Sequence, residues 1–147
     1  MKATPPALFD KLTLKYDKNK KKNWHEMILR DIEFLLNDAS RSADLKLSEY
    51  AHCKISVINY GLPSLSKRIP VSVEPLLLAK HIQKIISTFE PRLIPDSIRV
   101  VPLSSSEQRA VLAILFDIYG IGLFTSGPEP VNLRIALDYS CGAIRVL

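Results

Sequence analysis

Histidine, cysteine and paired carboxylates are the side chains of this sequence that could perform catalysis or bind a metal. His52 and Cys53 are adjacent, which is poor geometry for two ligands of one zinc ion, and no second ligand pair exists. Neither a Cys–His nucleophile pair nor a glycosidase-type pair drawn from Asp31, Glu33 and Glu90 stands out from ordinary surface residues. The chain has no glycine-rich phosphate loop, no GxSxG and no HExxH motif. We therefore predict no catalytic, cofactor-binding or metal-binding residues.

The stretch SVINYGLPSLS, residues 56–66, combines an Asn59-Tyr60-Gly61 corner with Pro63 two residues later. Glycine readily adopts the left-handed backbone conformation that ends a helix, and proline cannot continue one. We therefore interpret Asn59, Tyr60, Gly61 and Pro63 as a structural corner that fixes how the first helical layer crosses the third helix. An ordinary tight loop is the simpler interpretation, and the two are compatible.

The stretch FEPRL, residues 89–93, places Glu90 and Arg92 on either side of Pro91 at the end of a helical pattern. Because a residue before proline disfavours the α conformation, the helix must end at Glu90. Two interpretations of the charged pair remain open. One is a local ion pair that joins the helix end to its own sheet, which stabilises little when exposed. The other is a docking point at which the planar guanidinium makes bidentate contacts with another protein.

Length and composition indicate one ordinary domain. The chain has 147 residues, of which 47% are hydrophobic and 24% are charged, and such a chain buries a sizeable core without disulfides or metals. The longest apolar run, residues 110–124, contains Asp117 and is shorter than the roughly 20 apolar residues that span a bilayer. With no secretory leader and two unpaired-looking cysteines, Cys53 and Cys141, we expect a reduced cytoplasmic protein without membrane insertion.

The net charge of +5 is concentrated near the N-terminus. Residues 1–30 contain eight Lys or Arg and three Asp or Glu, whereas residues 31–147 contain twelve of each. We predict a flexible basic arm over residues 1–22 and a single folded domain over residues 23–147. Nucleic-acid binding is not favoured, because no basic stripe continues into the domain.

Apolar periodicity predicts helices in the first half of the chain. Helical spacing runs from Trp24 to Asn37 and again up to Glu90, where Ser72 is the expected N-cap of the second helix. A short helix is expected before Gly61, where a left-handed residue ends it.

In the second half the period changes to two, which predicts strands. The fold class is therefore α+β, with two to three N-terminal helices packed on one face of a C-terminal antiparallel sheet of three to four strands. The last strand would have an open edge unless something covers it, and such edges accept strands of other chains. The predicted strands cover residues 97–101, 109–119, 131–139 and 143–147.

The stretches RDIEFLLN (30–37), SVINYGLPSLS (56–66) and FEPRL (89–93) occur in an order and spacing that resemble the TssE family. TssE proteins are baseplate subunits of bacterial type VI secretion systems and belong with the small wedge proteins of contractile phage tails, a group often labelled lysozyme-like. The resemblance runs from about residue 24 to the C-terminus and does not include the N-terminal arm. The lack of a distinguishable carboxylate pair agrees with treating the lysozyme label as misleading.

This resemblance implies a structural role in assembly and not an enzymatic one. It implies docking beside TssF, TssG and TssK in the baseplate wedge and help in initiating the contractile sheath. The family's Glu-Pro-Arg motif corresponds to Glu90, Pro91 and Arg92, which are implied to dock on the core bundle of the wedge. Two alternatives remain open, namely an adaptor or anti-adaptor of the same fold and a peptidoglycan-degrading enzyme. We expect the isolated protein to be a monomer without cofactors.

Overall fold

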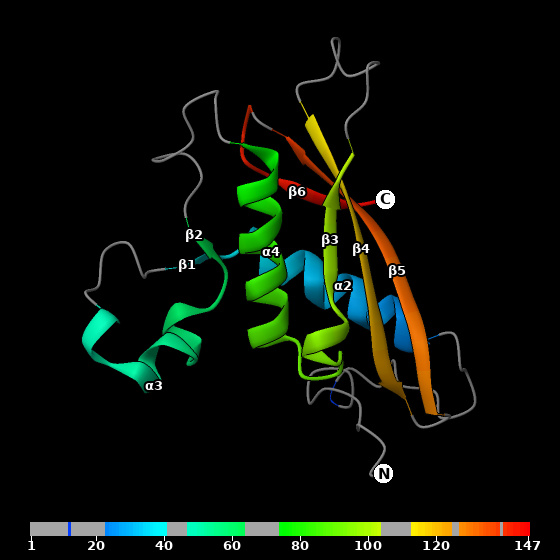
Figure 1. Cartoon of the computed structure of the whole chain (residues 1–147), viewed down its shortest axis with the longest axis horizontal. Helices are drawn as coiled ribbons and strands as arrows, with labels where there is room; N and C mark the ends of the chain where they lie inside the picture. The colour runs from blue at the N-terminus through cyan, green and yellow to red at the C-terminus, as the bar shows by residue number, and fades with distance from the viewer. Residues whose placement is uncertain are drawn as a thin grey trace.

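The computed structural model describes residues 23–40, 47–63, 74–103, 113–124, 127–138 and 140–147, together with Leu12. Within the described part of residues 23–147, three α-helices precede a four-stranded antiparallel sheet, which confirms the predicted α+β class (Figure 1). The helices are α2 (Asn23–Asn37), α3 (Ala51–Lys54) and α4 (Pro75–Phe89). The sheet has the order β3 (Arg99–Pro102), β4 (Ala113–Phe124), β5 (Gly127–Asp138) and β6 (Ile144–Val146).

Asparagine and proline mark the ends of the two long helices, α2 and α4. Helix α2 ends at Asn37 as predicted, and α4 ends at Phe89, directly before Glu90 and the proline. The start of α4 differs from the prediction, because its N-cap position is Glu74 and not Ser72. Pro75 is the first helical residue, where a missing N–H costs no intrahelical bond. Ser72 and, apart from Leu12, the predicted arm of residues 1–22 lie outside the described residues.

Strands β4 and β5 form a long hairpin that exceeds the predicted strands. They pair without interruption from Ala113 with Asp138 to Phe124 with Gly127. The prediction began the strand of residues 131–139 only at Val131, whereas β5 begins at Gly127 and includes Pro128 and Pro130. Both prolines lie beyond the reach of the short strand β6, so their missing N–H groups interrupt no ladder.

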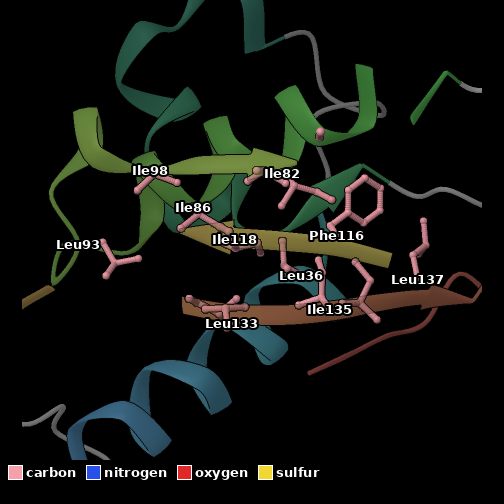
Figure 2. Close-up of a cluster of buried hydrophobic side chains, with 14 of the residues drawn as sticks. Leu36, Ile82, Ile86, Leu93, Ile98, Phe116, Ile118, Leu133, Ile135 and Leu137 are labelled. Carbon is pink, nitrogen blue, oxygen red and sulfur yellow. The ribbon is translucent and has the colours of Figure 1, made fainter. Parts of the chain in front are cut away.

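One face of the sheet carries the hydrophobic core. Alternating residues of β4 and β5 point to that face, as the period-two pattern predicted, and α2 and α4 cover them (Figure 2). Helix α4 lies along β3 (Figure 1), and α2 contacts β6 at its C-terminal end, where Asn37 hydrogen-bonds to Ile144. The elements that open and close the described chain therefore share one core. Its buried side chains include Ile28, Ile32, Leu36, Ile82, Ile86, Phe116, Ile118, Leu133, Ile135 and Leu137.

The segment between the long helices consists of short pieces. A 3₁₀ turn, η2 (Leu47–Glu49), precedes α3, and a second one, η3 (Val57–Asn59), follows it. The predicted short helix before Gly61 is therefore present as an α-helical turn and a separate 3₁₀ turn. A parallel pair of two-residue strands, β1 (Ala39–Ser40) and β2 (Leu62–Pro63), ties the segment back to the end of α2.

Candidate functional site

The predicted docking triplet forms a closed hydrogen-bonded turn after α4. The guanidinium of Arg92 donates from Nε to Oε1 of Glu90 at 2.7 Å and from Nη2 to Oε2 at 2.5 Å. The backbone N–H of Arg92 donates to the same Oε1 at 3.0 Å. Glu90 thus binds both the backbone and the side chain of Arg92, and the turn at Pro91 is fixed between them.

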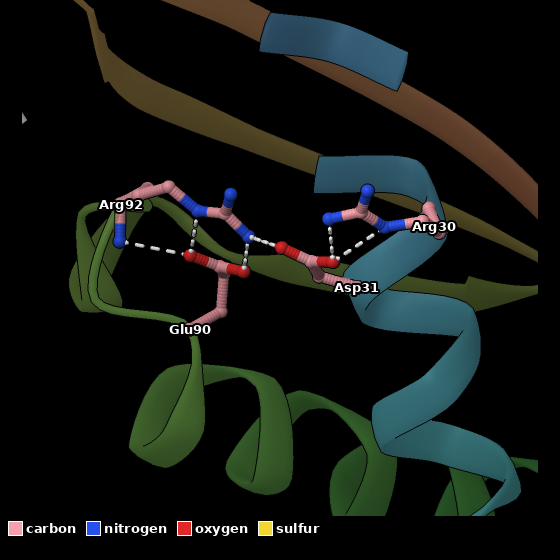
Figure 3. Close-up of polar contacts among 4 residues, drawn as sticks. All are labelled: Arg30, Asp31, Glu90 and Arg92. Atoms are coloured by element: carbon pink, nitrogen blue, oxygen red, sulfur yellow. Dashed lines mark hydrogen bonds and ion pairs between the residues drawn. The ribbon is translucent and has the colours of Figure 1, made fainter. Parts of the chain in front are cut away.

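Helix α2 extends this pair into a network of four charges. Nη2 of Arg92 also donates to Oδ2 of Asp31 at 2.8 Å. The other oxygen of Asp31 accepts two bonds from Arg30, at 2.9 and 2.6 Å. Figure 3 shows Asp31 lying between the two guanidinium groups. The alternating order Glu90, Arg92, Asp31, Arg30 joins the end of α4 to the middle of α2.

Glu90 and Arg92 form the local ion pair that was one of the two open interpretations, and the pair is buried. Glu90 is only 4% exposed and Arg92 only 7%. The reason is the path of the chain after Pro91, which turns back against the hairpin. The backbone O of Arg92 accepts a hydrogen bond from the N–H of Leu123 in β4 at 2.8 Å. This bond holds Arg92 between the end of α4 and the sheet. Within the triplet, only Pro91 is exposed.

The carboxylates next to Arg92 raise its pKa by more than its burial lowers it. Burial by itself lowers the pKa of a guanidinium, but the hydrogen bonds and charges of Glu90 and Asp31 raise the pKa of Arg92 overall. One donor, Nη1, is buried and has no hydrogen-bond partner among the described residues. The network is therefore nearly but not fully satisfied, and removing either carboxylate leaves further donors buried without an acceptor.

The predicted structural corner lies beside this network. Tyr60 packs edge-on against Phe89, the last residue of α4, with ring centroids 5.5 Å apart. Burial, followed by the negative charges of Asp31, Asp38 and Glu90, raises the pKa of the Tyr60 hydroxyl. The amide of Asn59 closes the corner by donating to the backbone O of Lys54 at 2.8 Å.

Gly61 is the residue of the corner for which no other amino acid fits. Its φ of +101° lies in the region that favours glycine, and an added Cβ would lie 2.3 Å from the carbonyl oxygen of Asp38. The same oxygen accepts a hydrogen bond from the N–H of Leu62 at 2.9 Å. This hydrogen bond joins the corner to the residue that follows α2. Strand β2, Leu62–Pro63, begins directly after Gly61.

Two residues at this site were not predicted. Asp31 links the helices, although the sequence marked it only as an ordinary acid. Asn37, the last residue of α2, hydrogen-bonds through its amide to both backbone groups of Ile144. It therefore covers part of the edge of β6, which was expected to be open unless something covered it. Both residues belong to the stretch RDIEFLLN, so the only signal in the sequence was the stretch itself.

Among the described residues, no metal site was found. No group of three or more His, Cys, Asp or Glu among them could hold a metal ion. Asp31 and Glu90 each hydrogen-bond to arginine, so neither is a free general acid. Within the described part of the chain, no helix combines the length and apolar character that a membrane crossing needs.

Comparison with known proteins identifies the family. The model of the family described as baseplate wedge protein gp25 matches residues 22–126. The chain belongs to the gp25 baseplate wedge family. This is the family to which TssE corresponds, so the resemblance seen in the sequence is confirmed. The match contains the whole charged network and the corner and ends before β5. No curated protein and no solved structure matches the chain.

Proposed function

We propose that this gp25-family protein is a structural baseplate component of a type VI secretion system. In this proposal it docks on the wedge complex with TssF, TssG and TssK and helps to initiate assembly of the contractile sheath in the cytoplasm. The family match supports a structural baseplate role. The resemblance of three stretches to TssE favours a secretion system over a phage tail.

The observation that carries the docking proposal is the buried network behind an exposed turn. Glu90 and Arg92 are buried, whereas Pro91 between them is exposed. Next to the turn, the side chains of Arg30 and Asp31 are 33% and 24% exposed. In the proposed complex, Glu90 and Arg92 hold Pro91 in place, and the partner contacts the turn together with the adjoining part of α2. A surface fixed in advance loses less conformational entropy on binding than a mobile loop.

The arrangement of the core supports residues 23–147 as one unit. Helix α2 contacts β6, the last strand, and both contribute to the same buried cluster. An assembly subunit with this construction presents α2, the turn at Pro91 and the sheet edge as fixed parts of one surface.

Co-purification with the baseplate proteins tests the proposal. The full chain, expressed with TssF, TssG and TssK from the same gene cluster, is expected to co-purify as a stable complex, and its deletion is expected to abolish sheath assembly. Arg134→Ala is the control variant and is expected to co-purify like the unmodified chain. Arg134 makes a bidentate pair with Asp117 that resembles the Arg92–Glu90 pair, but it is exposed on the outer face of the sheet. Normal sheaths in the deletion strain, or lysis bands of the purified protein on a peptidoglycan zymogram, would overturn the structural role. Co-purification with a regulatory protein in place of the wedge proteins would favour the adaptor alternative.

A further inference from the structure

The charges of residues 31–147 balance in total but are unevenly distributed along the chain. Residues 50–89 contain five Lys or Arg and a single acidic residue, Glu74. Residues 31–49 and 90–147 together contain seven Lys or Arg and eleven Asp or Glu. The part of the chain that forms α3, η3 and α4 therefore has a net charge of +4, and the remainder of residues 31–147 has a net charge of −4.

Helix α4 presents one continuous exposed row of side chains. Leu76, Lys80, Lys84 and Thr88 are spaced four residues apart and are all exposed, whereas the side chains that point to the sheet are buried. Leu77 lies beside this row and is 50% exposed, and Leu76 is 55% exposed. Residues four apart form a ridge on a helix, and such ridges pack into the grooves of another helix. The exposed row of α4 therefore has the form of a helix-packing surface.

The two lysines of the exposed row have no partner of opposite charge among the described residues. None of these residues forms an ion pair with Lys80 or Lys84, and α4 itself contains no Asp or Glu. By contrast, Arg30, Arg92 and Arg134 each bind a carboxylate. Like charges four residues apart slightly destabilise a helix. An acidic side chain of another molecule would relieve this repulsion without displacing an existing bond.

The segment next to the end of α4 has a similar character. Tyr60, which follows η3, packs on Phe89, so η3 lies beside the last turn of α4. Figure 1 shows the sheet on one side of α4 and α3 with β2 on the other side. Neither α3 nor η3 contains a buried residue or an acidic one, and Val57 and Ile58 are 85% and 46% exposed. A molecule that approaches α4 from this side therefore meets exposed aliphatic side chains and basic charge.

We propose that the exposed row of α4 binds an acidic amphipathic helix of another protein. Carboxylates of that helix pair with Lys80 and Lys84, and its apolar side chains cover Leu76 and Leu77. The chain's own N-terminal arm does not fit as the occupant, because residues 1–22 contain seven lysines and two aspartates. The inference does not rest on the proposed function, which assigns docking to the turn at Pro91 and to α2.

Two other classes of anionic partner fit the surface less well. Single-stranded nucleic acid binds through aromatic side chains that stack on bases, and the exposed row of α4 contains none. A basic amphipathic helix lies on a membrane by inserting its apolar face, but the wide apolar face of α4 is buried in the core.

The test uses the isolated full-length protein and a labelled peptide of about four helical turns, with leucines at helical spacing and glutamates at most other positions. A second peptide has glutamine in place of every glutamate. The double variant Lys80→Glu with Lys84→Glu is expected to bind the glutamate peptide at least roughly ten-fold more weakly than the wild type, because two attractions become repulsions. Arg99→Glu with Arg145→Glu is the matched control, since both arginines are exposed on the outer face of the sheet and the change in net charge is the same.

A third variant separates apolar contact from charge. Leu77→Ser keeps every charge and removes an apolar contact, so it is expected to weaken peptide binding several-fold with little change in the unfolding midpoint. Equal affinity of the wild type and the double lysine variant, equal binding of the two peptides, or no binding of the glutamate peptide would overturn the proposal. Tighter binding of nucleic acid or of phosphatidylserine vesicles than of the glutamate peptide would also overturn it. Because the assay contains no baseplate protein, a negative result leaves the proposed function standing.

Discussion

Two arginine–carboxylate pairs in this molecule have similar geometry and different surroundings. Arg92 binds Glu90 through Nε and Nη2 at the end of α4, and Arg134 binds Asp117 through Nε and Nη2, at 2.6 and 3.0 Å, on the outer face of the sheet. Glu90 and Arg92 are almost completely buried, whereas the side chains of Arg134 and Asp117 are 49% and 15% exposed. The comparison shows that bidentate geometry alone does not indicate the role of an ion pair.

Burial changes what each pair contributes. Water solvates the members of an exposed pair when they separate, so that pair contributes little to stability. A buried pair has lost this alternative, and the removal of one member leaves an uncompensated charge in a poorly solvated site. The Glu90–Arg92 pair therefore works as a brace between two helices and the hairpin, and the Asp117–Arg134 pair is a surface contact.

Removing one carboxylate from the brace is expected to have the largest effect. Glu90→Ala should lower the free energy of unfolding by about 3–5 kcal/mol, because Arg92 then remains buried with Asp31 as its one remaining carboxylate partner. Denaturant unfolding at neutral pH measures this change. Asp117→Ala is the control, and equal losses for the two variants would show that burial does not distinguish the two pairs.

The corner beside the brace provides the next largest effect. Gly61→Ala should cost at least about 2 kcal/mol, because it combines a strained positive φ with a Cβ that collides with the carbonyl of Asp38. Gly127→Ala is a matched control, since Gly127 also has a positive φ of 120° but no atom within 4 Å of an added Cβ. Both variants strain a backbone with positive φ, but only Gly61→Ala adds a steric collision, so the difference between their unfolding midpoints measures the effect of the collision. A larger loss of stability in Gly127→Ala than in Gly61→Ala would contradict the role assigned to the corner.

The smallest effect concerns the pH dependence of the exposed pair. The hydrogen bond from Arg134 is the main cause that lowers the pKa of Asp117 below its ordinary value. Because the folded-state pKa is depressed, the pair stabilises the fold above the ordinary carboxyl pKa, and this contribution is lost as the pH falls through the folded-state pKa. Thermal midpoints of the wild type and Arg134→Ala should therefore converge in acid. A difference that grows on acidification would contradict the assignment.

The sequence was sufficient to predict the fold class, the ends of the two long helices and the buried face of the sheet, but not all element boundaries or the short strands β1 and β2. The period-two pattern of Val131, Leu133 and Ile135 predicted the buried face of β5, and Pro91 predicted the end of α4. These features are local, because periodicity and proline geometry act within a few residues.

The contacts that make the site come from distant parts of the chain and were not predictable in the same way. Asp31 meets Arg92 across 61 positions, and Asn37 meets Ile144 across 107. A single sequence does not show which polar residues converge. This explains why the burial of Glu90 and Arg92 and the contact between Asn37 and the last strand were not predicted.

The central claim is that a buried brace holds an exposed turn for docking, and Pro91→Ala tests it most directly. Pro91 is exposed and lies outside both helix and sheet, so the substitution is expected to leave the unfolding free energy within about 1 kcal/mol of the wild type. It removes the constraint that ends α4 at Glu90, and binding to the purified TssF–TssG complex should weaken by about 2 kcal/mol, the scale of an interface hot spot. Binding and stability measured on the same preparation decide the matter. Wild-type affinity in a folded Pro91→Ala protein would show that the turn is not the docking surface and that the network serves the fold alone.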